Sequence, residues 1–514
     1  MTDAVIVGGG LAGAATACWL AQAGRRVVLL ERETAPVDKI CGEFISGEAQ
    51  MYLRRIGINL AGLGARPITR LRLVHGAGEV AVDLPFLGLG LSRRVLDEAL
   101  LLHAAACGAE VRRGQVVDRI RTDAGIVAEI SGQEDLAAQT LFLATGKHDC
   151  RGLRRRQAHL PDDLVGFKMH FCLDPPQLRA LEGYVEVLMF GRGYGGLQCV
   201  EDGRANLCLV VDRSQLTRAG GHWEGLLDDL KRDQPHLRAR LHGAVERMDR
   251  PLSIYRVPYG FVHVPRPNDP PDLFRLGDQV GVIPSFTGDG MAIALHSAAV
   301  ASEVYLQGRP ASEYHRRLHA DVSPLIRRAA AMYRFAQWRY GRGALMTLAR
   351  AWPRGLRLAA SLTRVPPRAL LRRSAIPIFL MLAGAAQAQA PSPAGLWRSY
   401  DDRTGRERGL IRIREEAGQL IGSITGTIDP AEAARTCDNC KGDRHGRPIL
   451  GLTILTGLHR QGEGWAGGEI VDPETGSVYR CSLRLAKGGA ELVLRGYIGI
   501  PLFGRTQTWR RVAP

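Results

Sequence analysis

The chain has 514 residues, which is too many for one ordinary hydrophobic core, so we expect two or three domains. Apolar residues make up 45% and charged residues 23%, which excludes a disordered, collagen-like or coiled-coil protein as the overall class. The net charge of +16 is concentrated, because residues 314–373 hold fourteen arginines and one acid, whereas the other 454 residues carry only +3. A nucleic-acid-binding protein usually spreads its basic charge more widely, so we expect no nucleic-acid partner.

The pattern of apolar residues divides the chain into segments of different structure. Strands and helices alternate up to about residue 146, which predicts an α/β domain with a parallel sheet of the Rossmann type. Later segments are strand-rich, helical and finally all-β. The predicted organisation is a nucleotide-binding domain (1–160 and 260–310), an interleaved β-rich substrate domain (161–259), an arginine-rich helical segment (311–371), a signal-like segment or linker (372–394) and a small β-barrel (395–514).

The first thirty residues carry a glycine fingerprint. Gly8, Gly10 and Gly13 form G-x-G-x-x-G directly after a predicted strand and at the start of a predicted helix. Gly8 permits a tight turn, Gly10 lets the backbone approach a pyrophosphate, and Gly13 lets the helix pack on the strand. The helix start offers N–H groups to phosphates, and Glu31 ends the second strand, where an acid accepts hydrogen bonds from ribose hydroxyls. The complete arrangement predicts a dinucleotide site.

A second segment decides which dinucleotide we expect. Gly277 and Asp278 follow the strand LFRL and precede VIPSFTGDGMAIALHSA, which opens another helix. An aspartate here suits the ribityl chain of a flavin, and a helix N-terminus suits the negative charge that reduction leaves on the ring. Because the chain has one fingerprint of this kind, we predict FAD as the bound cofactor and NAD(P)H as a transient electron donor. The predicted cofactor-binding residues are Gly8, Gly10, Gly13, Glu31, Arg32, Cys41, Gly42, Arg93, Ala144, Thr145, Gly146, Gly277, Asp278, Gly288, Gly290 and Met291.

These segments together resemble a known superfamily. The fingerprint, the stretches SRRVLDEALLLHAAACGAEV (92–111) and LFLATG (141–146), and the Gly277–Asp278 segment recur in this order in flavoproteins of the geranylgeranyl reductase and aromatic hydroxylase type. The resemblance covers about residues 1–340. It implies that Arg93 lies by the cofactor and that Asp278 binds ribitol.

KICGEFIS (39–46) is similar to the reductase branch of that superfamily, in which the cysteine of a Cys-Gly pair lies near the flavin face. The resemblance makes Cys41 a candidate catalytic residue, and the alternative is a small buried apolar residue. The reductases line their substrate cavity with a Tyr-x-Trp-x-Phe-Pro stretch. FGRGYGGLQC (190–199) keeps Tyr194, a second candidate, but has Gly196 in place of the tryptophan.

Departures from each branch leave the reaction open. The hydroxylase branch has a histidine after the Gly-Asp pair, where this chain has Gln279, and the W-x-W-x-I-P motif of halogenases is absent. Lys147 and His148 follow a strand end and either contact the cofactor or lie in a solvated loop. We expect an FAD-dependent oxidoreductase with a hydrophobic isoprenoid, lipid-like or aromatic substrate and no metal site. Hydride transfer to a C=C bond is the leading hypothesis, and hydroxylation of an aromatic or polyketide-like ring by a monooxygenase is the alternative.

Residues 333–373 interleave arginines with Leu, Met, Trp and Ala in a helical, amphipathic pattern. Trp338, Tyr340 and Trp352 suit a membrane interface, and each arginine near anionic headgroups favours binding by about 1 kcal/mol. We therefore expect peripheral membrane contact. The alternative is a helical cap on the flavin domain with a solvated cationic face.

Residues 372–390 (RRSAIPIFLMLAGAAQAQA) have the layout of a secretory signal peptide. The apolar run is shorter than the roughly 20 residues that a membrane-spanning helix needs. One interpretation is a secreted protein joined to a cytosolic enzyme, with the flavoprotein in the cytoplasm at the inner membrane face and the C-terminal domain periplasmic or secreted. The alternatives are an alanine-rich linker, a buried helix, or a gene-boundary artefact.

The C-terminal stretches GLWRSYDD, CDNCKGDRHGRPILGL and RGYIGIPLFGRTQTW look like a small uncharacterised domain family of secreted bacterial proteins, over residues 395–512. Its members resemble lipocalin-type barrels, and six to eight short strands suit such a fold. We expect Trp397 to stack with Arg505 or Arg510, and Cys437 and Cys440 to form a disulfide or redox pair rather than half a metal site with His445. As a function of another class, the barrel would be an envelope ligand-binding module.

Overall fold

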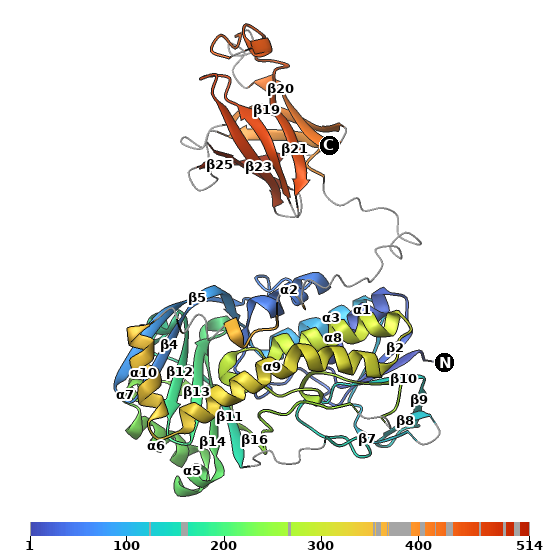
Figure 1. Ribbon diagram of the computed structural model, residues 1–514, viewed down its shortest axis with the longest axis vertical. Coiled ribbons are helices and arrows are strands. Elements are labelled where there is room, and N and C mark those ends of the chain that lie inside the picture. Colours follow the sequence, from blue (N-terminus) through green and yellow to red (C-terminus); the bar gives the residue numbers. More distant parts are fainter. Residues whose placement is uncertain are drawn as a thin grey trace. The chain divides into compact units, whose positions relative to one another are not determined.

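The computed structural model divides the chain into two compact units, residues 1–380 and 381–514, each of which is described by itself (Figure 1). The signal-like segment 372–390 lies outside the described residues. Among the residues that the structure describes, we find no helix with both the length and the hydrophobicity of a membrane-spanning segment. The structure describes residues 2–122, 125–155, 163–265, 269–352, 355, 361–366, 369, 392–400, 407–416, 418–427, 435–440, 442–461, 464–486, 490–497 and 504–512.

The first sheet of the N-terminal unit is parallel and five-stranded. Alternate residues of its central strand point to opposite faces: Ala4 and Ile6 pack among the helices, whereas Val5 and Val7 pack against a small three-stranded sheet. A parallel sheet covered on both faces needs strands that are apolar throughout, which confirms the Rossmann-type α/β fold. The sheet order is β17 (Leu273–Arg275), β10 (Thr140–Leu143), β1 (Ala4–Val7), β2 (Val27–Glu31) and β6 (Glu110–Arg113).

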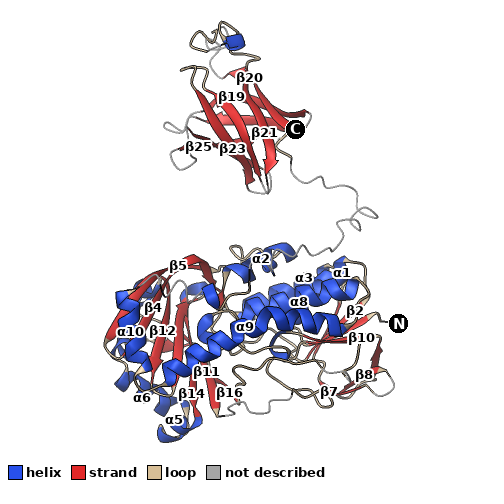
Figure 2. Ribbon diagram, in the orientation of Figure 1, coloured by secondary structure: helices blue, strands red, loops and turns tan. Residues whose placement is uncertain are grey.

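Helices cover one face of this sheet and the small sheet covers the other, as Figure 2 shows. The helices are α1 (Leu11–Gln22), α2 (Gly47–Ile56), α3 (Arg93–Ala106) and α8 (Gly290–Leu306), and the small sheet consists of β7 (Val117–Arg121), β8 (Ile126–Ile130) and β9 (Leu136–Ala138).

The second sheet has nine strands and is mostly antiparallel. Three of its strands lie within residues 1–160, the range that the sequence pattern assigned to the nucleotide-binding domain: β3 (Phe44–Ile45), β4 (Arg66–His75) and β5 (Gly78–Gly90). Alternation of apolar residues identifies a strand but not the sheet in which it pairs. The order is β15 (Val245–Glu246), β11 (Leu164–Cys172), β14 (Arg204–Asp212), β13 (Gly193–Cys199), β12 (Gly183–Phe190), β4 (Arg66–His75), β5 (Gly78–Gly90) and β3 (Phe44–Ile45), and β16 (Leu252–Tyr255) pairs with β11.

Short helices bury one face of the second sheet. Trp223, Leu226 and Leu230 of α6 (Trp223–Asp233) pack against apolar side chains of β11 and β14. The other short helices on this sheet are α4 (Pro175–Leu181), α5 (Arg213–Arg218) and α7 (Pro235–Arg240).

The arginine-rich segment forms α9 (Ala311–Gln337) and α10 (Gly341–Ala351). The first half of α9 is buried in the core of the first sheet, and α10 buries Met346 and Ala349 against Leu73 and Met189 of the second sheet. Arg317 pairs with Glu303 and Glu313, so not every arginine of this segment presents its charge to solvent.

A buried ionic cluster joins the second sheet to α7. Glu186 of β12 is fully buried, and its carboxylate contacts Arg72, His236 Nε2 at 2.8 Å and Arg240 Nη2 at 2.9 Å. Burial by itself raises the pKa of Glu186, but the hydrogen bonds from His236 and Arg240 outweigh it and lower the pKa to about 2. The cluster therefore depends on an ionised carboxylate.

The C-terminal unit is a closed eight-stranded barrel, which confirms the small β-barrel expected from the sequence. Trp397 and Trp509 are its largest fully buried side chains, and Cys437 and Cys440 form a disulfide. The strands are β18 (Gly395–Tyr400), β19 (Glu407–Glu416), β20 (Gln419–Thr427), β21 (Thr453–Gln461), β22 (Gly464–Val471), β23 (Val478–Ala486), β24 (Glu491–Tyr497) and β25 (Gly504–Arg511).

The expectation that Arg510 stacks with Trp397 was wrong. The guanidinium of Arg511 lies 4.3 Å from the Trp397 ring centroid, whereas Arg510 lies over Tyr400 at 5.4 Å, and the side chain of Arg505 is outside the described residues. The reason is register, because Trp397 pairs directly with Arg511 where β18 meets β25 and closes the barrel.

Candidate functional site

A cavity lies where the ends of the first sheet face the second sheet. One wall is made of turns and helix starts, and it contains Gly10, Gly146, Gly277 and Gly288. The opposite wall comes from β11, β14, β16 and the chain that follows them. Its residues are almost all apolar or small: Gly166, Cys208, Val210, Ile254, Val257 and Tyr259.

The glycine fingerprint forms the turn between β1 and α1. Gly8 has a φ of +104°, and a Cβ there would lie 2.4 Å from the carbonyl oxygen of Ala144. A Cβ on Gly13 would lie 1.9 Å from the carbonyl oxygen of Gly8, so this position requires the absence of a side chain. No side chain caps the N-terminus of α1 at Gly10, which leaves the backbone N–H groups of the first helical turn available to an anion at the cavity.

Glu31, at the end of β2, is 5% exposed and lies behind this turn. Its carboxylate accepts hydrogen bonds from the backbone N–H of Gly9 at 2.6 Å and of Glu33 at 3.0 Å. It therefore fixes the fingerprint to the second strand. Arg32 points away, toward Glu33, and its side chain is mostly exposed.

Two charged side chains meet at the opposite end of the glycine wall. Asp278 follows β17, Lys147 follows β10, and Lys147 Nζ lies 3.1 Å from an Asp278 carboxylate oxygen in the cavity lining. Burial alone would lower the pKa of Lys147, but the Asp278 carboxylate outweighs burial and raises it. The pair thus places a hydrogen-bond donor, the Lys147 ammonium, and an acceptor, the Asp278 carboxylate, side by side in the cavity lining.

Arg93 and Cys41 line the cavity between these ends. The Arg93 guanidinium makes two hydrogen bonds to Asp97, at 2.7 and 2.8 Å, which hold it in place on α3. The Cys41 sulfur accepts the backbone N–H of Glu43 at 3.3 Å. Burial raises the pKa of Asp97, but Arg93 and Lys39 outweigh it and lower the net value.

Not every residue selected from the sequence reaches the cavity. Tyr194 is buried one layer behind it, where its hydroxyl lies 2.7 Å from the hydroxyl of Tyr259. Gly8, Gly13, Glu31, Arg32 and Thr145 also lie outside the lining. The selected residues that line the cavity are Gly10, Cys41, Gly42, Arg93, Ala144, Gly146, Gly277, Asp278, Gly288, Gly290 and Met291.

Sequence reasoning missed the hydroxyl cluster at this wall. The hydroxyls of Tyr259, Tyr194 and Ser285 are mutually hydrogen-bonded, and Tyr259 and Ser285 line the cavity. Burial raises the pKa of Tyr259, so it stays a neutral O–H donor at ordinary pH. No motif marks Tyr259, because it meets Tyr194 only through folding.

The residues present fit FAD. The unsubstituted turn and the uncapped start of α1 suit a pyrophosphate, and Asp278 offers an acceptor to ribitol hydroxyls. The small residues at Gly42 and Gly288 leave room for a flat ring at the cavity wall.

Comparisons with known families agree with this geometry. Residues 3–38 match a family described as FAD dependent oxidoreductase. Residues 395–511 match a family described as uncharacterized protein conserved in bacteria (DUF2147). Two separate segments of the chain thus match two different family models, as expected, and FAD is the cofactor of the first.

Several curated proteins are similar to the N-terminal part. A menaquinone reductase of Mycobacterium tuberculosis is 29% identical over 152 residues, and the match spans 28% of this chain but only 37% of that protein. A menaquinone reductase of Mycolicibacterium smegmatis is 26% identical over 60% of this chain and 76% of that protein. Digeranylgeranylglycerophospholipid reductase 2 of Methanopyrus kandleri is 29% identical over 41% of this chain and 55% of that protein.

Solved structures share the fold at low sequence identity. The flavin-dependent brominase Bmp2 matches with a TM-score of 0.58 and 16% identity, over 70% of this chain and 93% of that one. PqsL, a probable FAD-dependent monooxygenase of Pseudomonas aeruginosa, matches with a TM-score of 0.54 and 17% identity, over 67% and 99% of the two chains. These likenesses establish the fold alone.

Proposed function

We propose that this FAD-dependent oxidoreductase acts on a hydrophobic small molecule of the isoprenoid, lipid-like or aromatic class, by hydride transfer to a C=C bond. The observation that carries the proposal is the apolar wall opposite the glycine turns, formed by side chains such as Val210, Ile254 and Val257. An apolar wall binds a substrate by removing its surface from water, whereas a polar substrate would require buried hydrogen-bonding partners there.

In this proposal the wall of glycine turns binds the cofactor and the wall from the second sheet binds the substrate. Gly10 and the start of α1 hold the pyrophosphate, Asp278 and Arg93 hold the remainder of the cofactor, and the sheet wall holds the substrate. When bound, FAD supplies two-electron chemistry, and NAD(P)H or another donor reduces it. The apolar side chains exclude water from the reacting atoms, and the Tyr259 hydroxyl offers a proton within the cavity.

A monooxygenase is the second candidate. The observation that favours it is the similarity to squalene epoxidase 5 of Arabidopsis thaliana, which is 34% identical over 86 residues, 16% of this chain and 17% of that protein. The two reactions differ in their need for oxygen.

Anaerobic single turnover separates the two candidates. The protein is reduced without oxygen and mixed with menaquinone, a geranylgeranyl lipid or squalene, while the flavin absorbance is followed. Hydride transfer to a C=C bond predicts reoxidation with at least one of these compounds in the absence of oxygen, with a product that has one isoprenoid C=C bond fewer. Reoxidation only after oxygen is admitted, with an oxygenated product, would contradict hydride transfer and establish the monooxygenase.

We further propose that the end of α9 and α10 contact an anionic membrane surface. The rings of Phe335, Trp338 and Tyr340 adjoin one another, with centroids 6.1 and 5.4 Å apart, and all three side chains are exposed. Leu348 of α10 and Trp352, which directly follows this helix, add further exposed apolar area. Residues 334–352 contain four arginines and no acid, so the patch combines aromatic and cationic groups.

Vesicle binding tests this surface. Full-length protein is expected to sediment with vesicles of phosphatidylcholine and phosphatidylglycerol but not with phosphatidylcholine alone. Trp338→Ala with Trp352→Ala is expected to weaken binding, and Arg339→Gln to weaken it about fivefold, because one arginine contributes about 1 kcal/mol. Leu102→Ala, at a side chain that is 61% exposed on α3, is the matched control and should bind normally. Equal binding by all four proteins, or no binding by the wild type, would contradict membrane contact. The arginine-rich segment would then be a helical cap on the flavin domain with a cationic face in solvent.

For the barrel we propose an envelope ligand-binding role if the chain is cleaved at the signal-like segment 372–390. Tags at both ends and a blot test this directly. A C-terminal fragment outside the cytoplasm supports it, whereas full-length protein confined to the cytoplasm contradicts it.

A further inference from the structure

A buried ionic cluster lies directly behind the part of the cavity formed by Ile40–Phe44. Glu43 lines the cavity and is fully buried. Its carboxylate contacts Lys168 Nζ, lies 2.8 Å from His170 Nε2, and accepts the backbone N–H of Arg93 at 2.9 Å. Lys168 and His170 are 0% and 1% exposed and both come from β11 of the second sheet. A charged cluster is thus shared between the two walls of the cavity.

The same sheet also holds the backbone that leads to Glu43, residues 38–43, which we call the Cys41 loop. Lys168 Nζ donates to the carbonyl of Lys39 at 3.2 Å and lies 3.4 Å from a carboxylate oxygen of Asp38. Asn206 of β14 donates its amide to the carbonyl of Cys41 at 3.0 Å. Side chains of β11 and β14 therefore bind the loop on both sides of Cys41.

The loop needs such support because Glu43 has a φ of +60°. A non-glycine residue in this region costs about 1–3 kcal/mol and persists where the surroundings fix it.

The sheet face that provides the support is costly as well, because buried charges require close partners. On this face His170 Nδ1, Asn206 Oδ1 and both amide atoms of Gln198 are buried without a hydrogen-bond partner among the described residues. Apolar packing would be cheaper, so this face has a role beyond stability.

A metal site is the first role to consider, because atoms of Asp38, Glu43 and His170 lie within 4.8 Å of one another. The ammonium of Lys168, however, contacts both carboxylates. A cation already occupies the space between the two acids and would repel a metal ion. The geometry therefore favours a role in which the cluster binds other parts of the protein rather than a metal ion.

We propose that Lys168, His170 and Asn206 are positioning residues that fix the Cys41 loop against the cofactor, so that the substrate-binding sheet determines where Cys41 stands in the cavity. This inference rests on the proposed assignment of the cavity to FAD and substrate. Its physical basis is that three side chains of the second sheet make the polar contacts that hold a strained loop at the cavity. Removing one of them releases the loop without touching the glycine turns.

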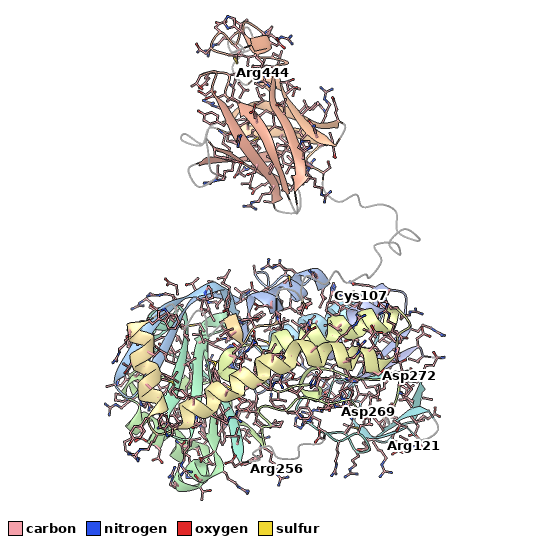
Figure 3. All side chains as sticks on the ribbon, in the orientation of Figure 1. Cys107, Arg121, Arg256, Asp269, Asp272 and Arg444 are labelled. Atoms are coloured by element: carbon pink, nitrogen blue, oxygen red, sulfur yellow. A yellow bond between two sulfur atoms is a disulfide. The ribbon has the colours of Figure 1, made fainter. Side chains whose placement is uncertain are left out.

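The reactivity of the Cys41 thiol measures the position of the loop. Cys172 is exposed and Cys107 lies at the surface end of α3 (Figure 3), so both are first changed to serine. In that background the alkylation of Cys41 by iodoacetamide is followed by mass spectrometry, with FAD added and without it. Lys168→Met and Asn206→Ala are expected to raise the rate several-fold in both states. Lys231→Met, at a partly exposed lysine of α6, should leave it unchanged.

A second readout separates positioning from a loss of stability. The visible circular dichroism of bound flavin depends on the asymmetric contacts of the ring, so it is expected to change in Asn206→Ala while the thermal midpoint stays near wild type. If Lys168→Met does not fold, the Cys41 alkylation rate and the flavin dichroism of Asn206→Ala test the proposal. Folded variants with unchanged Cys41 reactivity and unchanged dichroism would overturn the proposal. Failure to bind FAD at all would instead overturn the proposed function, because the alkylation rate without FAD still reports the loop.

Discussion

Gly13→Ala is expected to yield a folded chain that has largely lost its flavin. The new Cβ would lie 1.9 Å from the carbonyl oxygen of Gly8, so the turn that carries Gly10 must move. Overpacking of this kind costs about 1–3 kcal/mol, which corresponds to roughly 5- to 150-fold weaker binding if the strain falls on the cofactor turn. Titration of the apo-protein with FAD, followed by quenching of flavin fluorescence, measures the change.

The matched control is Gly343→Ala. Gly343 lies in α10, where a Cβ would meet no atom within 4 Å, so alanine is expected to stabilise the helix by about 0.5–1 kcal/mol and leave FAD affinity unchanged. Normal FAD affinity in Gly13→Ala would show that the fingerprint turn does not carry the cofactor.

Glu186→Met is expected to destabilise the N-terminal unit by about 3–5 kcal/mol, because it leaves the buried Arg240 and the partly buried Arg72 and His236 without their shared carboxylate. Scanning calorimetry of the full chain measures the loss. Glu79→Met is the control: Glu79 also approaches Arg72 and His236 but is 54% exposed, so its replacement is expected to cost less than about 1 kcal/mol. Equal losses of unfolding free energy in Glu186→Met and Glu79→Met would contradict the argument that the burial of Glu186 determines the size of its effect.

The same cluster of Glu186, Arg72, His236 and Arg240 predicts that the stability of the folded protein falls at acid pH. The pKa of Glu186 is lowered in the folded protein to about 2, so its contribution to stability is complete above the unfolded value of 4.5 and is lost as pH falls from 4.5 toward 2. Wild-type stability is therefore expected to decline more steeply over that interval than the stability of Glu186→Met. Parallel pH profiles would contradict the assignment.

The cofactor turn could be predicted from the sequence because its information is local. Gly8, Gly10 and Gly13 lie within six residues, and steric requirements of one strand–turn–helix fix their identity. The barrel was predictable for a similar reason, since short alternating strands separated by glycine turns specify a small closed sheet.

The second wall of the cavity could not be predicted in the same way. Lys168, His170 and Asn206 are polar residues on strands whose other face is apolar. In a sequence, such alternation of polar and apolar residues predicts a strand with one face in solvent. Their partners, Glu43 and Cys41, are more than 120 residues away, and only the pairing of the sheet brings them together. Arg511 escaped prediction for a related reason, because the register at which the barrel closes depends on every strand between β18 and β25.

The most direct test of the account is the absorbance spectrum of purified full-length protein, with acid release of any bound cofactor. We expect flavin bands at about 375 and 450 nm and roughly one FAD released per chain. Gly13→Ala, purified in parallel, is expected to have weaker bands. A colourless protein that does not acquire these bands on incubation with FAD would contradict the central claim that the N-terminal unit is a flavoenzyme.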